Sequence, residues 1–405
     1  MGPSTVAGVA ELLARGLGHH LEPELLAGLD RGSAPDDSAD SWAADDWAAT
    51  GLLDASGRAV PLNSVMHGRP VTVARAAGVV LDSVARERFG ADLRIDGAEV
   101  LGRRAALAGT THRTSPDQVS RGGSARLLRA TDGWWVLNLA RPSDLELVPA
   151  LVEDDVDDPW AAVERWSARI TAQAAVDRAT LLDLPAARWG ETPSPEVPWR
   201  ITSTAARHAS TTRRVVNLGS LWAAPLAAHV LGRLGFEVVH VESTQRRDAS
   251  RWGDPTFYAE LRAGAEVRTI DLTAPDGPGE LSDLVASADI VIEASRPRAL
   301  EGLGVAPAKV MADGRARTWL QITGHGPDQP HRVGFGDDAA VAGGIVTVRD
   351  DGTPDFLGDA VADPLTGLLG ALAVAASHSP DRSTIVRTSL AGSAAYSRAA
   401  GDITI

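Results

Sequence analysis

Apolar runs short enough to be strands alternate with helical patterns across residues 215–323, and this alternation constrains the fold more than any other feature. Helical periodicity over Trp222–Leu234 and Gly279–Ser287 lies between such runs. Strands and helices that alternate at this spacing favour a parallel sheet with helices on both faces. We therefore predict an α/β layer over residues 210–325. Its predicted strands are Val215–Leu218, Glu237–Val241, Arg268–Leu272, Ile290–Glu293 and Thr318–Thr323.

The N-terminal half carries a different pattern. Its periodicity predicts a helix pair within residues 1–30 and a long helix over Val71–Phe89. Two strand patterns, Leu127–Arg129 and Trp134–Leu139, flank an Asp-Gly turn that is typical of a hairpin. Further helices are predicted at Pro142–Val152, Trp160–Ala175 and Ala179–Leu182.

A Pro-rich segment at residues 191–199 marks the boundary between the two regions. We predict a first domain of residues 1–199, helical with a small α+β part, and a Rossmann-like α/β domain of residues 200–405. The acidic and polar residues 31–40 are predicted to form an exposed connector. A short internal similarity links residues 45–51 to residues 337–344. It suggests that the two halves are related, although a chain rich in Ala and Asp can produce so short a match by chance.

Composition excludes several classes of site. The chain has no cysteine, which removes thiol nucleophiles, thiolate metal sites and disulfides. Its only lysine, Lys309, lies in an Ala-Lys-Val sequence, so neither a P-loop nor a pyridoxal Schiff base is indicated. Lys plus Arg total 39 against 53 Asp plus Glu, and the formal charge of -14 disfavours nucleic acid and anionic membranes as partners. Because neither a long apolar run nor a signal-like N-terminus is present, we expect a cytoplasmic protein.

The loop after the first predicted strand tests for dinucleotide binding. A Rossmann dinucleotide site runs from its first strand into G-x-G-x-x-G, so that the backbone approaches a pyrophosphate. Here the loop at residues 217–225 contains only Gly219. Glu242 does stand at the end of the second strand, where a ribose-binding acid belongs. With one feature of the two, the sequence gives little support for an NAD(P) oxidoreductase.

Several motifs of the C-terminal half resemble those of family III CoA-transferases, the group of formyl-CoA and carnitine CoA-transferases and α-methylacyl-CoA racemases. The similarity runs in order over residues 213–400, about half of the chain. Its segments include Val216–Pro225, Leu234–Glu242, Asp248–Gly253, Arg268–Leu272, Ala288–Glu293, Leu300–Gly304, Ile322–Gly326 and Gly358–Gly367. Family members begin with this α/β segment, whereas here sequence that resembles the family's smaller domain precedes it. The resemblance therefore implies a CoA-binding domain in a chain whose halves are rearranged or permuted.

The resemblance implies that Asp363 is the nucleophile of an acyl-CoA:carboxylate CoA-transferase. A carboxylate can attack a thioester carbonyl to form a mixed anhydride and then carry CoA as an aspartyl thioester. Taken alone, Asp363-Pro364 is also typical of a helix N-cap with proline at the first helical position, where the helix end would keep the carboxylate ionised. Gly122 and Gly123 resemble the family's glycine loop, which predicts a flap near the acyl group, although a plain connector is equally consistent with them.

The resemblance also implies a CoA site after the first three strands of the α/β domain. Its predicted residues are Ser220, Leu221, Trp222, Ala223, Glu242, Arg246, Arg247, Arg251 and Leu272. Arginines suit the CoA phosphates, although Arg246 and Arg247 also fit a solvated turn. Trp222 stands where transferases usually have a small polar residue, and it also fits core packing. Other family contacts are replaced by Ser243, Ala294 and Gly302.

Two alternatives stand beside the transferase. Racemases of the family pair an aspartate with a histidine near residues 334–336 to remove an α-proton, but His325 and His331 fall outside the matching position. The changed contacts and the rearranged halves also allow a non-catalytic CoA-binding protein. For the transferase, the resemblance implies acyl-CoA and a carboxylic acid as substrates, no permanently bound cofactor, no metal and a homodimer.

Overall fold

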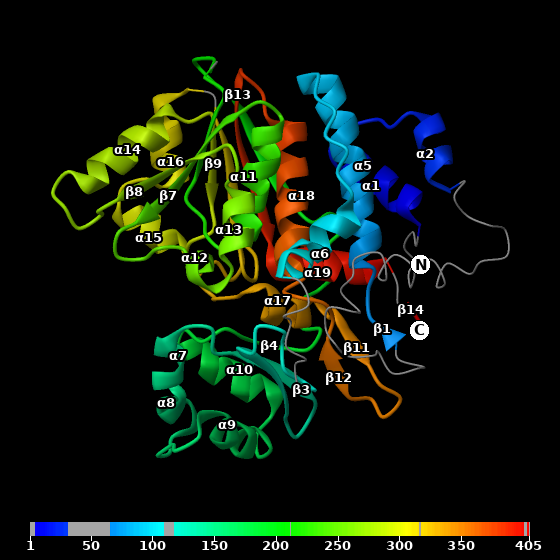
Figure 1. The fold of residues 1–405 in the computed structure, drawn as a ribbon, viewed down its shortest axis with the longest axis vertical. Coiled ribbons are helices and arrows are strands. Elements are labelled where there is room, and N and C mark those ends of the chain that lie inside the picture. Colours follow the sequence, from blue (N-terminus) through cyan, green and yellow to red (C-terminus); the bar gives the residue numbers. More distant parts are fainter. Residues whose placement is uncertain are drawn as a thin grey trace.

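The chain has a mixed α/β fold whose large sheet is built from its C-terminal half (Figure 1). The computed structural model describes residues 5–30, 65–108, 117–210, 212–315, 317–400 and 403–404. The predicted connector at residues 31–40 and the internally similar segment at residues 45–51 lie outside the described residues.

A seven-stranded sheet forms the centre of the fold. Its strands are β5 (Arg200–Ala205), β6 (Arg214–Asn217), β7 (Glu237–Ser243), β8 (Glu266–Ile270), β9 (Ile290–Glu293), β10 (Thr318–Thr323) and β13 (Arg382–Ser389). They lie in the order β5-β13-β10-β9-β6-β7-β8, and all neighbours are parallel except β5 and β13. From β6 the strands continue through β7 to β8 at one edge, and from β9 they continue through β10 to β13 toward the other edge. This is the order of a doubly wound Rossmann-like sheet. The predicted α/β class is confirmed, and each of the predicted strands is present.

The central strands of the sheet are buried on both faces, and successive residues of a strand point to opposite sides. Val215 of β6 packs in one core with α11 (Ala223–Arg233) and α18 (Ala362–Ser377). Its neighbour Val216 packs in another core with α14 (Gly277–Ser287). Other helices of this half are α12 (Ser250–Gly253), α13 (Pro255–Leu261), α15 (Pro297–Gly302), α16 (Pro307–Val310), α17 (Gly336–Gly343) and α19 (Leu390–Ala399). Strands buried on both faces have nearly continuous apolar sequences, which is why they could be located in advance.

N-terminal helices share the largest hydrophobic core with α11 and α18. They are α1 (Val6–Gly16), α2 (Pro23–Asp30), α5 (Pro70–Phe89) and α6 (Gly97–Ala108). The predicted helix pair and long helix are therefore present, and α5 lies beside α18 (Figure 1). A Cβ on Gly97 would lie 2.1 Å from the carbonyl carbon of Ala74, so α6 crosses α5 at backbone contact. This crossing fixes the position of α6 relative to α5. The domain boundary at residues 199 and 200 stays a prediction.

A smaller unit follows, with a hydrophobic core of its own. Its antiparallel sheet contains β2 (Ala125–Arg129), β3 (Trp134–Asn138) and β4 (Ala186–Arg188). Its helices are α7 (Pro142–Glu146), α8 (Val148–Val152), α9 (Pro159–Ser167) and α10 (Ala172–Leu181). The predicted hairpin is confirmed by the pairing of β2 with β3.

Two predicted helices of this unit are interrupted. Instead of one helix over Pro142–Val152 there are α7 and α8, and instead of one over Trp160–Ala175 there are α9 and the start of α10. The second interruption has a local cause at Thr171, whose hydroxyl accepts a hydrogen bond from the Ala174 N–H at 3.3 Å. Because such a cap satisfies a free N–H group, it starts a new helix.

A four-stranded antiparallel sheet joins distant parts of the chain. It contains β1 (Val65–Met66), β11 (Val346–Val348), β12 (Pro354–Phe356) and β14 (Ile403–Thr404), in the order β12-β11-β1-β14. The sequence analysis did not predict it, because strands this short carry little periodicity.

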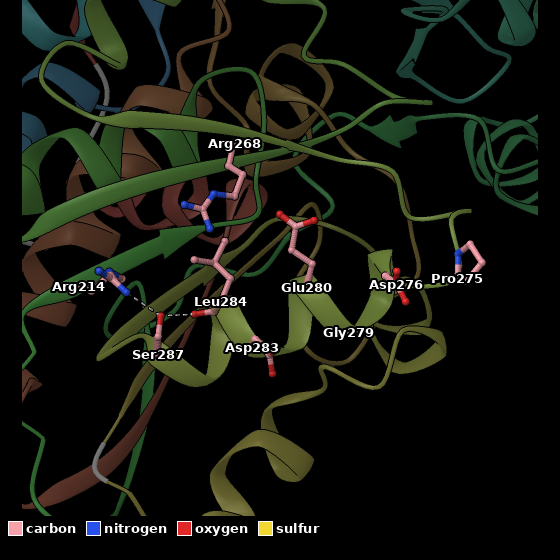
Figure 2. A pocket seen from close by; sticks show the side chains of 9 residues that line it. All are labelled: Arg214, Arg268, Pro275, Asp276, Gly279, Glu280, Asp283, Leu284 and Ser287. Atoms are coloured by element: carbon pink, nitrogen blue, oxygen red, sulfur yellow. Dashed lines mark hydrogen bonds between the residues drawn. The ribbon is translucent and has the colours of Figure 1, made fainter.

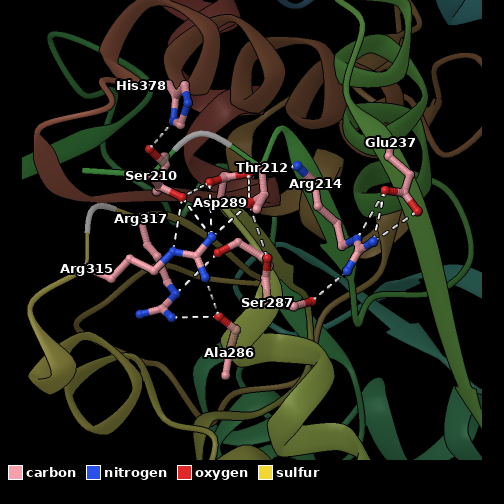
Figure 3. Close-up of polar contacts among 12 residues, drawn as sticks. Ser210, Thr212, Arg214, Glu237, Ala286, Ser287, Asp289, Arg315, Arg317 and His378 are labelled. Atoms are coloured by element: carbon pink, nitrogen blue, oxygen red, sulfur yellow. Dashed lines mark hydrogen bonds and ion pairs between the residues drawn. The ribbon is translucent and has the colours of Figure 1, made fainter. Parts of the chain in front are cut away.

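A polar network closes the edge of the large sheet at which the parallel strands begin (Figure 3). Asp289 accepts hydrogen bonds from the Thr212 hydroxyl at 2.6 Å and from the Arg214 N–H at 2.8 Å, and the Ser210 hydroxyl also donates to it. Burial favours the neutral form of Asp289, but these hydrogen bonds outweigh it and lower its pKa. Since its lone pairs are already used within the fold, this network is structural.

Candidate active site

Four aspartates meet where α17 and α18 begin. They are Asp337 and Asp338 in the first turn of α17, Asp359 in the loop before α18, and Asp363 in the first turn of α18. The Ala360 N–H donates to Asp337 Oδ1 at 3.0 Å. A Cβ on Gly336 would lie only 2.5 Å from Asp363 Oδ2. The two helix starts are therefore in direct contact, and the carboxyl groups form one cluster.

The four carboxyl groups differ in access. Asp338 and Asp359 are buried, whereas Asp337 and Asp363 keep part of their surface exposed. Asp338 accepts a hydrogen bond from the Asn138 side-chain amide at 2.9 Å, which attaches the smaller unit to α17. Asp363 is therefore the more accessible of the two residues, while Asp338 contributes to the packing of the two units.

The predicted N-cap role of Asp363 is wrong. The N-cap of α18 is Val361, so Asp363 and Pro364 lie inside the first turn. The Asp363 N–H already donates to the Ala360 carbonyl at 2.9 Å, which closes a turn before the predicted start. The Asp363 carboxylate is thus not the cap of α18; it accepts a hydrogen bond from the Gly336 N–H instead.

The expected ionisation of Asp363 by the helix end is also corrected. Burial raises the pKa of Asp363 to about 7, and the charge of Arg104 offsets this effect only in part. Burial and the neighbouring Asp359 raise the pKa of Asp337 to about 6. Burial likewise raises the pKa of Asp338 to about 7. Because like charges share a shielded space, the cluster holds protons near neutral pH.

Arg104, which the sequence analysis did not name, contacts the aspartate cluster. Its Nε–H donates to Asp359 Oδ2 at 2.8 Å, and its Nη2 also bonds Asp359. Its Cζ lies 4.7 Å from the centre of the Trp222 ring. Arg104 and Asp359 are 255 residues apart in the sequence, so no local pattern could have indicated this pair.

The predicted glycine loop lies beside the cluster. Ser120 hydrogen-bonds the Asp337 carboxylate, and Arg121 is close enough to Asp359 for the two charges to interact. Gly122 and Gly123 follow and are exposed, and a Cβ on either would meet nothing within 4 Å. Gly123 has a φ of +78°, which is the left-handed region that favours glycine. The fold therefore brings this loop to the aspartates, and its role as a flap stays a prediction.

The residues after β6 lie at the carboxyl edge of the sheet, next to the point where strand order reverses. Ser220 is exposed, whereas Trp222 and Ala223 are buried. Leu221 has a φ of +65°, and its N–H donates to Asp248 Oδ2 at 2.9 Å. A Cβ on Gly367, one turn after Asp363, would lie 2.6 Å from the Ala223 carbonyl oxygen. This contact places the predicted CoA segment against the start of α18.

Two other predicted CoA residues are bonded to each other. The Arg251 Nε–H donates to Glu242 Oε2 at 2.9 Å, and the Tyr258 hydroxyl donates to Glu242 Oε1 at 2.7 Å. Burial favours the neutral form of Glu242, but the hydrogen bonds from Arg251 and Tyr258 outweigh it and lower its pKa. Arg251 is thus committed to a buried carboxylate, which leaves fewer of its N–H groups for a phosphate.

The remaining predicted CoA residues lie nearer to solvent. Arg246 and Arg247 are exposed, and within the described ranges neither side chain forms an ion pair. Leu272 is partly buried after β8. Trp252 nearby is 72% exposed. Two free cations and an exposed indole at this edge suit the phosphates and the base of a nucleotide.

The racemase alternative requires a histidine near residues 334–336, and the fold brings His325 next to this segment. A Cβ on Gly334 would lie 3.1 Å from His325 Nε2 and 3.3 Å from Asp338 Oδ2. Burial, with a smaller effect of Arg332, lowers the pKa of His325 to about 3, so this ring is neutral at physiological pH. His331 is exposed. His325 is therefore the histidine that a test for α-proton removal must include.

A surface pocket of about 670 Å³ lies elsewhere, along α14 (Figure 2). Its lining combines both charges, with Arg214 and Arg268 opposite acidic residues of the helix such as Glu280 and Asp283. Arg214 is already held by Glu237 at 3.0 Å and by the Ser287 hydroxyl at 3.1 Å. None of the predicted site residues lines this pocket, so we assign it no role in the chemistry.

Comparison with known families identifies the C-terminal half. Residues 212–399 match CoA-transferase family III. The match confirms the predicted resemblance over this segment. The order of the halves is not tested by the match and stays a prediction. In the described part of the chain, no helix has both the length and the apolar character needed to cross a membrane.

Curated relatives match over the same region. The succinyl-CoA–D-citramalate CoA-transferase of Chloroflexus aurantiacus is 31% identical over 42% of this chain and 45% of its own length. The succinate–glutarate CoA-transferase of Agrobacterium fabrum is 29% identical over 40% of this chain and 45% of its own length. This chain therefore spans less than half of each relative. The crystal structure of a hypothetical protein from Mycobacterium tuberculosis is 26% identical, covers 47% of this chain and 57% of that one, and superposes with a TM-score of 0.41.

Proposed function

We propose that the chain transfers CoA from an acyl-CoA to a carboxylic acid, with Asp363 as the nucleophile. The observation that carries the proposal is the position of Asp363, a residue with part of its surface exposed whose carboxyl group is not the cap of α18 and which lies in the segment that matches CoA-transferase family III. The glycine loop and the residues after β6 lie around it and supply candidates for holding the acyl group and CoA.

The chemistry proposed for Asp363 conserves the energy of the thioester. The carboxylate attacks the thioester carbonyl and releases CoA thiolate, forming an acyl-aspartyl anhydride. The thiolate then attacks the aspartyl carbonyl, which releases the first acid and leaves an aspartyl-CoA thioester. The second acid repeats the two steps in reverse order, leaving as acyl-CoA and restoring Asp363. No water takes part, so shielding of the carboxyl group protects the intermediates from hydrolysis.

The raised pKa of Asp363 predicts how the rate of CoA transfer depends on pH. Only the ionised carboxylate is a nucleophile, and burial places its pKa near 7. Transfer should therefore fall as pH decreases from about 8 to about 6. From the resemblance we also propose a homodimer that binds no permanent cofactor, and from the sequence pattern a cytoplasmic location and a domain boundary at residues 199 and 200.

An exchange assay tests this function. The chain is incubated with a panel of acyl-CoAs and isotope-labelled carboxylic acids in D₂O, and the label and the α-deuterium in the acyl-CoA pool are measured by mass spectrometry. We expect label to enter acyl-CoA without net hydrolysis. Deuterium at the α-carbon without label would instead indicate a racemase that uses His325. Tight CoA binding with neither change would indicate a non-catalytic CoA-binding protein.

Binding of CoA provides a further prediction at the exposed arginines. The double variant Arg246→Ala, Arg247→Ala is expected to weaken CoA binding by about 1.5–3 kcal/mol, because it removes two cations that can pair with phosphate. The affinity of the wild type should also fall with added salt, and that of the variant should fall less. Isothermal titration calorimetry at two salt concentrations measures both effects.

The matched control for this prediction is Arg165→Ala, Arg169→Ala. It changes the net charge equally but lies in the smaller unit, on α9 and the turn after it. Arg251 is kept in both variants, because its removal would leave Glu242 without its cation. Equal CoA affinity in both double variants would remove Arg246 and Arg247 from the site.

A further inference from the structure

Arg104 is the residue through which the N-terminal helices contact the aspartate cluster. It lies on α6, outside the residues 212–399 that match the family. Two of its nitrogens bond the carboxylate of Asp359, and the ring of Trp222 covers one face of the guanidinium, with the Cζ 4.7 Å from the ring centre. A planar guanidinium held at one edge by a carboxylate and on one face by an indole has little freedom to move.

We propose that Arg104 is a positioning residue for Asp363, the cation that holds Asp359 in place and balances the negative charge beside the nucleophile. The inference rests on the transferase function proposed above and adds a residue to it. Among the described residues no hydrogen bond joins Arg104 to Asp363. Arg104 therefore acts on Asp363 through its charge and through the position of Asp359.

The charges around Asp363 explain why a cation is needed. The charged groups that face it are Asp337 and Asp338 on α17 and Arg104 on α6. Asp359 adds a further carboxylate next to Asp337, and Arg121 approaches Asp359 from the glycine loop. Because carboxylates in one shielded space disfavour each other's ionisation, a fixed cation shifts the balance toward the anion. Arg104 does lower the pKa of Asp363 against the larger effect of burial.

The residues around Arg104 hold it in its position beside Asp359. Trp222 is fully buried and meets Phe257 edge to face with 4.9 Å between ring centres. Asp359 is 2% exposed and the Arg104 side chain is 28% exposed, so the pair is shielded from water mainly on the carboxylate side. Burial lowers the pKa of Arg104, but the Asp359 carboxylate outweighs it and the net shift is upward, so the guanidinium stays charged. The backbone contact at Gly97 fixes the helix that carries it.

The test replaces Arg104 and follows the titration of Asp363 directly. The infrared absorption of protonated carboxyl groups, taken as a difference from Asp363→Asn, gives the midpoint of Asp363 without any substrate. In Arg104→Gln we expect the midpoint to rise by about 1 pH unit or more, and transfer at pH 7 to fall about tenfold in kcat with little change in the KM for acyl-CoA. Arg104→Lys keeps the charge but cannot bind both oxygens of Asp359 in the bidentate way, so we expect a smaller rise of the Asp363 midpoint.

Arg103→Gln is the matched control, because Arg103 precedes Arg104 on α6 and is paired with a different acid. Its Nε–H donates to Glu260 Oε1 at 2.6 Å. This variant should keep the wild-type midpoint. A wild-type midpoint in Arg104→Gln, or an equal rise in Arg103→Gln, would overturn the proposal. Should Arg104→Gln fail to fold, a wild-type midpoint in Arg104→Met, which also removes the charge, would overturn it. If the wild type transfers no CoA, the proposed function fails, while the infrared midpoints still decide the role of Arg104.

Discussion

Replacement of Asp363 by asparagine is expected to reduce CoA transfer by on the order of 10³-fold or more, because an amide cannot form the anhydride or the thioester. CoA binding should stay close to that of the wild type, since the predicted phosphate contacts lie after β7 and not at α18. Asparagine has nearly the same size and can still accept the hydrogen bond that the Gly336 N–H gives Asp363. Steady-state transfer rates and calorimetric CoA binding measure the two effects separately.

The same variant should be more stable than the wild type at high pH. Burial raises the pKa of Asp363 from an ordinary value of 3.8 to about 7, so the folded protein binds this proton more tightly than the unfolded chain does. The stability that comes from the bound proton is present at low pH and is lost as pH rises toward the folded pKa. Asparagine avoids this loss, and Asp363→Asn should therefore melt at a higher temperature than the wild type at pH 8. A stable but inactive variant is the expected signature of a functional carboxylate.

Covalent trapping identifies the nucleophile independently. After incubation with acyl-CoA, hydroxylamine should modify a peptide that contains Asp363 in the wild type and nothing in Asp363→Asn. The control is Asp350→Asn, an exposed aspartate of the same half that should keep wild-type transfer and trapping. Asp359→Asn is a poor control, because Asp359 holds Arg104. A normal transfer rate in Asp363→Asn would contradict the mechanism.

Gly336→Ala is expected to reduce transfer by about 10²-fold, because it displaces the nucleophile without removing it. A methyl group at this position would lie 2.5 Å from both the Ala360 carbonyl oxygen and Asp363 Oδ2, closer than real Cβ contacts. One of these obstacles is backbone, so the start of α18 must shift. Forcing an extra methyl group into a packed site also costs stability, here about 1–3 kcal/mol.

The control for this prediction is Gly279→Ala, in the first turn of α14. A Cβ there would meet nothing within 4 Å, and both its transfer rate and its unfolding midpoint should match the wild type or exceed it slightly. Urea unfolding of both variants separates the loss of activity from the loss of stability. Wild-type turnover in Gly336→Ala would mean that Asp363 is not held against α17 during catalysis.

The sequence determined the α/β half of this protein because its information is local there. Parallel strands buried on both faces read as continuous apolar runs, and helices with one buried face lie between them. Asp363, the residues after β6 and the residues around Glu242 all stand at the ends of such elements, in one contiguous segment that resembles a known family. The same local reading failed at Asp363-Pro364, where the Ala360 carbonyl starts the helix earlier than an Asp-Pro pair suggests.

Only the tertiary structure decided the charge of the site. Arg104 and Asp359 are 255 residues apart, and the Asn138 amide reaches Asp338 across 200 residues, so no periodicity or spacing could link them. The pKa of Asp363 depends on burial against α17 and on the cation that α6 brings, and neither is encoded near residue 363. An ionisation equilibrium responds to every charge and to all the solvent removed within a few ångströms. Those quantities exist only once distant segments have packed together.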